Sequence, residues 1–175
     1  MSNHPLEKFR YCPICGSSEF HENSEKSKKC GKCGFEFFMN PSAATAAFIV
    51  DEQGRVLVVR RSKEPAKGTF DLPGGFCDIG ETSEEGVMRE VKEETGLTVT
   101  SVKFLFSLPN TYLYSGLNIP TIDSFYLCTV ENTACAEAHD DAADAVWVPI
   151  NELEPELFGL QSISKGVAKW LSEYV

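Results

Sequence analysis

Three glutamates near the middle of the chain, Glu90, Glu93 and Glu94, are spaced so that a helix would carry all of them on one face. Three like charges within one turn repel one another, and the neighbouring cations Arg89 and Lys92 offset this only in part. A divalent cation would relieve the repulsion, and oxygen ligands suit a hard ion such as Mg²⁺ or Mn²⁺. The spacing alone also fits a solvated acidic face, which is the ordinary role of a Glu-rich helix.

The residues around these glutamates carry the signals of a capped helix. Thr82 followed three residues later by Glu85 is a capping-box signature, and Gly96 stands where a left-handed C-cap is expected. Val87 and Val91, four residues apart, mark a side that would face a core. We therefore expect a helix between Thr82 and Gly96 with one apolar side and one acidic side.

A longer pattern contains this helix. Its fixed positions, in chain order, are Gly75, Glu81, Arg89-Glu90-Val91, Glu93-Glu94 and Gly96-Leu97. This string resembles the Nudix box at every defined position. Residues 70–75 read Phe-Asp-Leu-Pro-Gly-Gly and resemble the family's usual entry to the box, with Phe70 where tryptophan is frequent. The resemblance implies an α/β fold, the Nudix α/β/α sandwich with a mixed sheet, and hydrolysis of a nucleoside diphosphate linked to another moiety.

Matching positions to the Nudix box implies a set of metal ligands. Glu90, Glu93 and Glu94 match the family's ligands for Mg²⁺ or Mn²⁺. The carbonyl of Gly75 would add a further ligand, and Glu81 would bind the ion through water or support the other ligands. With such ions bound, the family's chemistry is the hydrolysis of a diphosphate bridge by water.

Arg89 and a general base complete the implied catalytic set. Arg89 would orient the carboxylates through ion pairs, although an Arg89–Glu93 pair is also an ordinary stabilising contact on a helix. Family members take the base either from a box glutamate, here Glu93 or Glu94, or from a carboxylate on a downstream loop. On that loop we favour Asp141. Its neighbours with the same opportunity are His139, Asp140 and Asp144.

Two Cys-x-x-Cys pairs near the N-terminus predict a structural metal site. The pairs are Cys12 with Cys15 and Cys30 with Cys33, and each is followed by a glycine that permits a tight turn. Four thiolates satisfy tetrahedral Zn²⁺ with no open position, so the zinc would be structural. A redox pair or free thiols are alternatives that two correctly spaced pairs disfavour. We expect a small zinc ribbon in residues 1–38 and the Nudix hydrolase domain in residues 39–175.

A zinc ribbon joined to a Nudix domain resembles the NADH pyrophosphatases. Those enzymes carry Ser-Gln-Pro-Trp-Pro-Phe-Pro after the box, whereas residues 107–113 read Ser-Leu-Pro-Asn-Thr-Tyr-Leu and share only the serine and the first proline. We expect a substrate of the ADP-ribose, NADH or nucleotide-sugar type, contacted by Arg60, Tyr112 and Tyr114. A tyrosine ring stacked on adenine contributes about 1–3 kcal/mol. Equally, both tyrosines would fit packing of their loop onto the sheet.

Charge and composition narrow the choice of partners. The formal net charge of −10 disfavours binding to long nucleic acid, because proteins bind nucleic acid mainly through clustered Lys and Arg. The same charge is compatible with a small phosphorylated substrate, because bound metal ions can make the local potential positive. The ribbon lysines Lys26, Lys28, Lys29 and Lys32 are diluted by neighbouring glutamates, so a solvated hairpin is expected there. No apolar run approaches membrane-spanning length and residues 1–10 lack a secretory signal, so we expect a cytoplasmic protein without membrane contact.

The family resemblance further implies a homodimer, and two other functions stay open. One is a nucleotide-sensing Nudix domain without catalysis, which the presence of every box carboxylate disfavours. The other is an enzyme directed at an RNA 5′ cap, with the ribbon gripping the RNA.

The elements that must hold the glutamate helix follow from alternation and apolar runs. Residues 43–50 and 56–61 are expected strands of a hairpin, and residues 101–108 and 122–130 are two more strands, joined by a loop at 109–121. An acidic loop at 131–143 and a short strand at 146–149 follow. A closing amphipathic helix is predicted by the apolar stripe Ile163, Val167, Trp170, Leu171 and Tyr174.

Overall fold

The computed structural model describes residues 4–137 and 142–175. The chain falls into two compact units, Met1–Pro41 with Thr111–Pro120, and Ser42–Asn110 with Thr121–Val175. The predicted domain division after residue 38 stays a prediction. Neither helix in the described part of the chain has the length and apolar character needed to cross a membrane.

The first unit contains a three-stranded antiparallel sheet, in the order β1 (Phe20–Ser24), β2 (Ser27–Cys30), β3 (Glu36–Phe38). Its small core consists of Cys12, Phe20 and Cys30, with Phe9, Phe35 and Phe37 packed around them. Lys28 is 7% exposed, because its Nζ donates to the carbonyl of Phe9 at 2.9 Å. One of the four ribbon lysines is therefore turned inward and does not contribute to a solvated basic surface.

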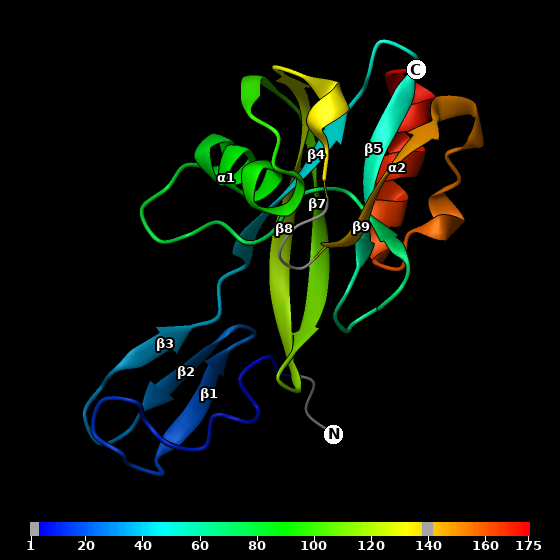
Figure 1. Cartoon of the computed structure of the whole chain (residues 1–175). Helices are drawn as coiled ribbons and strands as arrows, with labels where there is room; N and C mark the ends of the chain where they lie inside the picture. The colour runs from blue at the N-terminus through cyan, green and yellow to red at the C-terminus, as the bar shows by residue number, and fades with distance from the viewer. Residues whose placement is uncertain (1–3, 138–141) are drawn as a thin grey trace. The chain divides into compact units, whose positions relative to one another are not determined.

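The second unit has two sheets of three strands each between two helices (Figure 1). One sheet has the order β4 (Ser42–Ile49), β8 (Leu117–Val130), β7 (Val99–Tyr114), and the other β6 (Phe70–Asp71), β5 (Arg55–Arg61), β9 (Ala142–Pro149). The helices are α1 (Ser83–Thr95) and α2 (Gln161–Glu173), and short 3-10 turns span Thr133–Cys135, Ile150–Glu152 and Pro155–Leu157. β4 runs parallel to β8, whereas β5 runs antiparallel to β6 and β9. The predicted α/β/α sandwich with mixed strand directions is confirmed.

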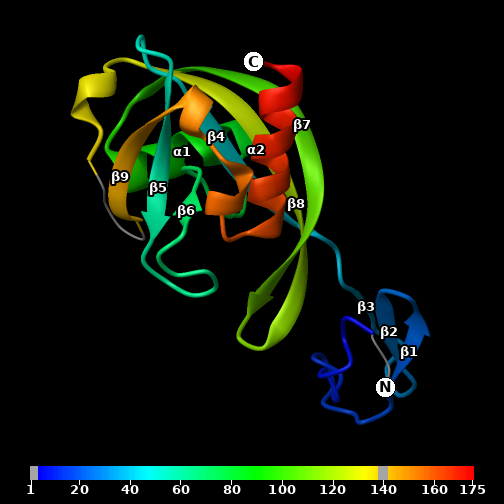
Figure 2. The same ribbon diagram turned by 90° about the vertical axis from the view of Figure 1, so that its right-hand side faces the viewer.

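Strand β4 is apolar on both faces because each face meets a different helix. Ala46 and Phe48 belong to the core that includes α2, where the Phe48 and Trp170 rings stack with centroids 4.4 Å apart. Ala47 and Ile49 belong to the core that includes Val87 and Val91 of α1. Successive strand residues point to opposite faces, so this alternation places the helices on opposite sides of the strand layer (Figure 2). The glutamate helix is thereby fixed by its valine side.

The loop predicted at residues 109–121 is wrong. β7 continues to Tyr114, β8 begins at Leu117, and a two-residue turn joins them in which Ser115 and Gly116 have φ of 49° and 74°. Proline is tolerated because Pro109 lies on β7, the edge strand of its sheet, and Pro120 precedes Thr121, where pairing of β8 with β4 begins. Strand β9 is likewise longer than predicted, starting at Ala142 rather than residue 146.

The closing helix is confirmed as α2, and its stripe is core over most of its length. Ile163, Val167 and Trp170 are at most 6% exposed, whereas Tyr174 follows the helix and is 44% exposed.

Candidate active site

The caps predicted for the glutamate helix are present at both ends of α1. At the start, Thr82 Oγ1 accepts from the N–H of Glu85 at 3.2 Å, and Glu85 Oε2 accepts from the N–H of Thr82 at 2.7 Å. At the end, Gly96 has a φ of 71° and its N–H donates to the carbonyl of Lys92 at 3.0 Å. Both ends of the helix are thus fixed by local sequence, independently of any bound ion.

The two residues Gly74 and Gly75, here called the glycine loop, lie against the glutamate side of α1. The N–H of Gly74 donates to Glu94 Oε2 at 3.0 Å. A Cβ on Gly75 would stand 2.7 Å from the Cδ of Glu90, and a Cβ on Gly74, whose φ is 151°, would stand 2.1 Å from the carbonyl oxygen of Thr45. A side chain is therefore excluded at Gly74 by the Thr45 backbone, and one at Gly75 would displace the Glu90 carboxylate, so backbone groups are brought directly to two carboxylates.

Arg89 is the centre of the charged network. Its Nη2 donates to Glu81 Oε1 at 2.7 Å, and its Nη1 donates to Glu90 Oε1 at 2.9 Å and to Glu93 Oε2 at 3.0 Å. Its Nη2 also donates to the carbonyl of Phe76 at 3.0 Å. One guanidinium thus joins three carboxylates from the loop and the helix, in the arrangement expected of a residue that orients ligands.

The contacts of Arg89 change the pKa values around it. Hydrogen bonds to Glu81 and other carboxylates raise the pKa of Arg89 above its already high value, and the bond from Arg89 lowers the pKa of Glu81. Glu90 behaves differently, because burial, together with the charges of Glu93 and Glu81, raises the pKa of its carboxyl despite the nearby Arg89. Its anionic form is therefore disfavoured in the absence of a further cation.

These residues fit a hard divalent cation by their chemistry. The glutamates present oxygen atoms from one helical face, Glu90 and Glu94 lie against a loop with no side chains, and Glu90 is held where its charge costs free energy. Among the described residues, only the four ribbon cysteines have three or more ligand atoms within 4.8 Å of one another. Arg89 accounts for the wider spacing of the glutamates, since its guanidinium stands between the carboxylates of Glu81, Glu90 and Glu93.

Comparison with known proteins agrees with this geometry. A NUDIX domain family model matches residues 39–171. The chain belongs to the Nudix family. It is 32% identical over 143 residues to the ADP-ribose pyrophosphatase of Methanocaldococcus jannaschii, covering 78% of each chain. It is 24% identical over 152 residues to the NAD-capped RNA hydrolase NudC of Vibrio parahaemolyticus, covering 87% of this chain and 55% of that protein.

A solved structure shows the same fold over nearly the whole Nudix chain. The crystal structure of a NUDIX hydrolase from Nitrosomonas europaea aligns with a TM-score of 0.72 at 18% sequence identity, covering 94% of this chain and 92% of the other. The family model confirms the Nudix family predicted from the box, and this structure confirms the fold class.

Other residues predicted for the Nudix site have different surroundings. The carbonyl of Gly75 accepts from the N–H of Thr45 at 2.8 Å. Arg60 donates to the carbonyl of Gly68 at 2.7 Å, and its guanidinium lies 4.6 Å from the centre of the Phe70 ring. Arg60 thus holds the segment that leads into β6, and its role as a substrate ligand stays a prediction.

The base and the stacking residues are also untested predictions. Asp141, with His139 and Asp140, lies outside the described residues, whereas Asp144 is exposed on β9 opposite Arg60. Tyr112 and Tyr114 stand on β7, in the part that belongs to the first unit, and Tyr114 is 64% exposed.

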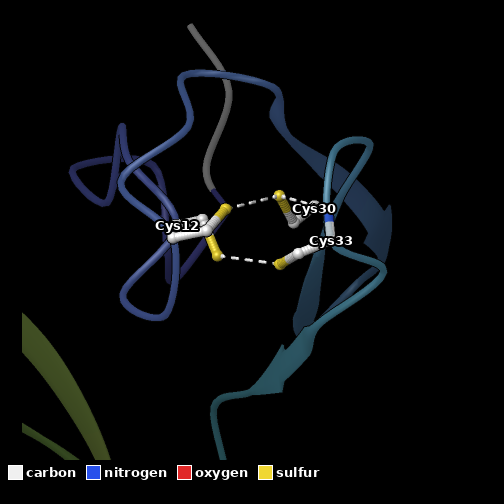
Figure 3. Close-up of side chains that lie close together, drawn as sticks. Cys12, Cys30 and Cys33 are labelled. Carbon is white, nitrogen blue, oxygen red and sulfur yellow. Dashed lines mark hydrogen bonds between the residues drawn. The ribbon is translucent and has the colours of Figure 1, made fainter.

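The four cysteines of the first unit come together, and Figure 3 shows Cys12 from one turn facing Cys30 and Cys33 from another. The Sγ atoms of Cys12 and Cys33 are 3.6 Å apart, as are those of Cys15 and Cys30, which is too far for a disulfide. The N–H of Cys33 lies 3.5 Å from the Cys30 sulfur and lowers the pKa of that thiol to about 7. At Cys33 the Phe35 N–H also lowers the pKa of the thiol, but hydrogen bonds with the other three thiols, together with burial, raise it to about 12. The cluster is compatible with Zn²⁺, which would replace these contacts between thiols by four zinc–sulfur bonds.

One contributor to the active site was not identified from the sequence. From the sequence, Gly74 stood only within the Phe-Asp-Leu-Pro-Gly-Gly entry to the Nudix box, yet its N–H is a hydrogen-bond donor to Glu94. The Pro-Gly-Gly run could have indicated this contact. Where a glycine has no side chain, a carboxylate from the helix can approach closely enough to accept a hydrogen bond from the glycine N–H.

Proposed function

We propose that this Nudix enzyme hydrolyses the diphosphate linkage of ADP-ribose or a closely related nucleoside diphosphate derivative, with Mg²⁺ or Mn²⁺ as cofactor. The products would be a nucleoside monophosphate and a phosphorylated partner. The observation that carries the proposal is the cluster of carboxylates that Arg89 joins beside the glycine loop. Similarity to a protein named as an ADP-ribose pyrophosphatase over 78% of both chains supports the choice of substrate.

The proposed roles follow from the contacts. Glu90 and Glu94 would hold a divalent cation beside the glycine loop, with Glu93 completing the set, and Glu81 would act through Arg89. A cation bound there would neutralise part of the diphosphate charge and so favour attack by water. Arg89 keeps Glu81, Glu90 and Glu93 oriented, because it holds each of these three by a charge-assisted hydrogen bond. The general base is Glu93, Glu94 or Asp141.

We further propose that residues 39–175 form the catalytic domain and that residues 1–38 form a ribbon stabilised by zinc. The sulfur geometry supports the ribbon, since all four ligand atoms lie within 4.8 Å of one another. With so small an apolar core, metal binding would supply much of the folding free energy of this segment.

A substrate panel tests the proposal. Purified protein is incubated with Mg²⁺ or Mn²⁺ and ADP-ribose, NADH, NAD, nucleotide sugars or dinucleoside polyphosphates, and product formation is measured. Glu93→Gln and Glu94→Gln are expected to abolish turnover, whereas Glu84→Gln, on the exposed first turn of α1, serves as the matched control. Full turnover in both box variants would contradict the proposed metal site.

Two other activities have specific support. Similarity to an NAD-capped RNA hydrolase and the cysteine cluster favour a capped RNA or NADH as an alternative substrate. A higher kcat/KM for NAD-capped RNA than for ADP-ribose, with steep salt dependence, would decide for the RNA. Tight ADP-ribose binding with no turnover in any metal would instead indicate a sensor.

A further inference from the structure

Asp71 is a buried carboxyl at the point where the chain passes from one sheet to the other. It is 8% exposed and pairs with Val59 of β5. Two residues later the chain bonds to β4 instead, since the carbonyl of Pro73 accepts from the N–H of Ala47 at 2.8 Å. The glycine loop follows immediately. The orientation of the chain at Asp71 therefore sets how the glycine loop meets the glutamates of α1.

Both carboxyl oxygens of Asp71 are engaged in fixing this crossover. Oδ2 lies 2.5 Å from Nη1 of Arg61, and the two side chains are only 11% and 16% exposed. Oδ1 accepts from the N–H of Leu72 at 2.9 Å. Nε of Arg61 donates in turn to the carbonyl of Pro65 at 2.8 Å. Asp71 thus holds the next peptide with one oxygen, and β5 through Arg61 with the other.

A second buried carboxyl, Asp123, joins three further elements near this pair. It accepts from Asn110 Nδ2 at 3.0 Å, from Thr121 Oγ1 at 2.6 Å and from Ser162 Oγ at 2.5 Å. Burial raises the pKa of Asp71, Arg61 opposes this, and the charge of Asp123 adds to it. A buried carboxylate that another acidic charge disfavours depends on its own ion pair, so the arrangement at Asp71 depends on the Arg61 contact.

We propose that Asp71, held by Arg61, is a positioning residue for the glycine loop and, through it, for Glu90 and Glu94. It touches neither the substrate nor the cation. The inference rests on the proposed function, because the glutamates it positions are the proposed cation ligands.

The test is Mn²⁺ affinity, measured by electron paramagnetic resonance, together with kcat and KM for ADP-ribose. Asp71→Asn keeps the side-chain shape and the acceptor for Leu72 but weakens the contact with Arg61. We expect about 10-fold weaker Mn²⁺ binding and a lower kcat with little change in KM, at a temperature where the variant is fully folded. Arg61→Lys, which keeps the charge but loses the two-point contact, is expected to act in the same direction.

The matched control is Asp51→Asn. Asp51 is also buried, 7% exposed, and bonded to an arginine, Arg55, but it serves the turn between β4 and β5. We expect it to lower stability and leave Mn²⁺ affinity and kcat unchanged.

Wild-type Mn²⁺ affinity and kcat in folded Asp71→Asn and Arg61→Lys would overturn the inference, as would equal losses in Asp51→Asn. If Asp71→Asn does not fold, Arg61→Lys decides. Wild-type protein that neither binds Mn²⁺ nor hydrolyses any substrate would overturn the proposed function and this inference together.

Discussion

The N–H of Gly74 donates to Glu94 Oε2 across 3.0 Å, so the loop before the Nudix box and the last turn of its helix share one hydrogen bond. The neighbouring Gly75 lies against Glu90. No side chain on the loop mediates either contact. The acidic face and the glycine loop are therefore one structural unit, and changes to either should affect both.

Gly74→Ala is expected to destabilise the fold by about 3 kcal/mol, because the new Cβ would overlap the Thr45 carbonyl at 2.1 Å and φ is 151°. Urea unfolding measures the loss. Gly54→Ala separates the two causes, since Gly54 has a φ of 71° with nothing within 4 Å of an added Cβ. It should cost only about 1 kcal/mol. Equal losses in both variants would contradict the overlap at Gly74.

Arg89→Lys is expected to lower kcat about 10- to 100-fold while the protein remains folded. Lysine keeps the charge but has no planar fork, so it does not hold Glu81, Glu90 and Glu93 together. Steady-state kinetics with circular dichroism checks this. Arg55→Lys, which alters another arginine paired with a carboxyl, should leave kcat unchanged. An unaltered kcat in Arg89→Lys would exclude the orienting role.

Two buried aspartates should affect the pH dependence of stability in opposite directions. Burial raises the pKa of folded Asp71, so the native state holds more protons than the unfolded chain between about pH 3.9 and that raised value. The contribution of Asp71 is full below that window and is lost as pH rises through it. Asp71→Asn should remove this loss.

For Asp51, burial acts to raise the pKa, but hydrogen bonds from Arg55 and Gln53 outweigh it and lower the pKa. Its contribution is therefore full above about pH 3.9 and is lost as pH falls through the lowered value. Urea midpoints from pH 3 to pH 8 measure both. A pH profile of Asp51→Asn that still loses stability in acid as steeply as the wild type would contradict the assignment.

The protein should contain about one Zn²⁺ per chain, and Cys33→Ser should lose it, because a structural site needs all four thiolates. Elemental analysis of purified protein measures the zinc. Cys135→Ser is the control, since Cys135 is also exposed but lies outside the cluster. Zinc retained at wild-type content in Cys33→Ser would rule out the four-cysteine site.

The sequence predicted the parts of the fold that are determined locally. Thr82, Glu85 and Gly96 specify the ends of α1 through backbone hydrogen bonds a few residues apart, so their types suffice to place the helix. The Nudix box predicted the family and the α/β/α layers, and the family model and the solved structure agree. Relatives named as pyrophosphatase and RNA hydrolase agree with the predicted enzyme class.

What the sequence did not predict depends on distant partners. Residues 109–121 were predicted as a loop, but the missing N–H groups of Pro109 and Pro120 are harmless in strands because β4, which is distant in the chain, pairs with β8 only from Thr121 onward and leaves β7 at the edge of the sheet. Lys28 was counted among the surface charges because the sequence does not show that its Nζ donates to the carbonyl of Phe9, which is 19 residues away in the chain. The roles of Tyr112, Tyr114 and Asp141 stay predictions.

Strand β7 runs from Val99 to Tyr114 along the edge of its sheet. A long edge exposes backbone groups on which another extended chain can assemble, and such assembly leads to aggregation. Pro109 interrupts that row, since it has no N–H to offer an incoming strand. Pro109, which lies in a segment predicted as a loop, therefore protects the folded protein against the addition of further strands to β7.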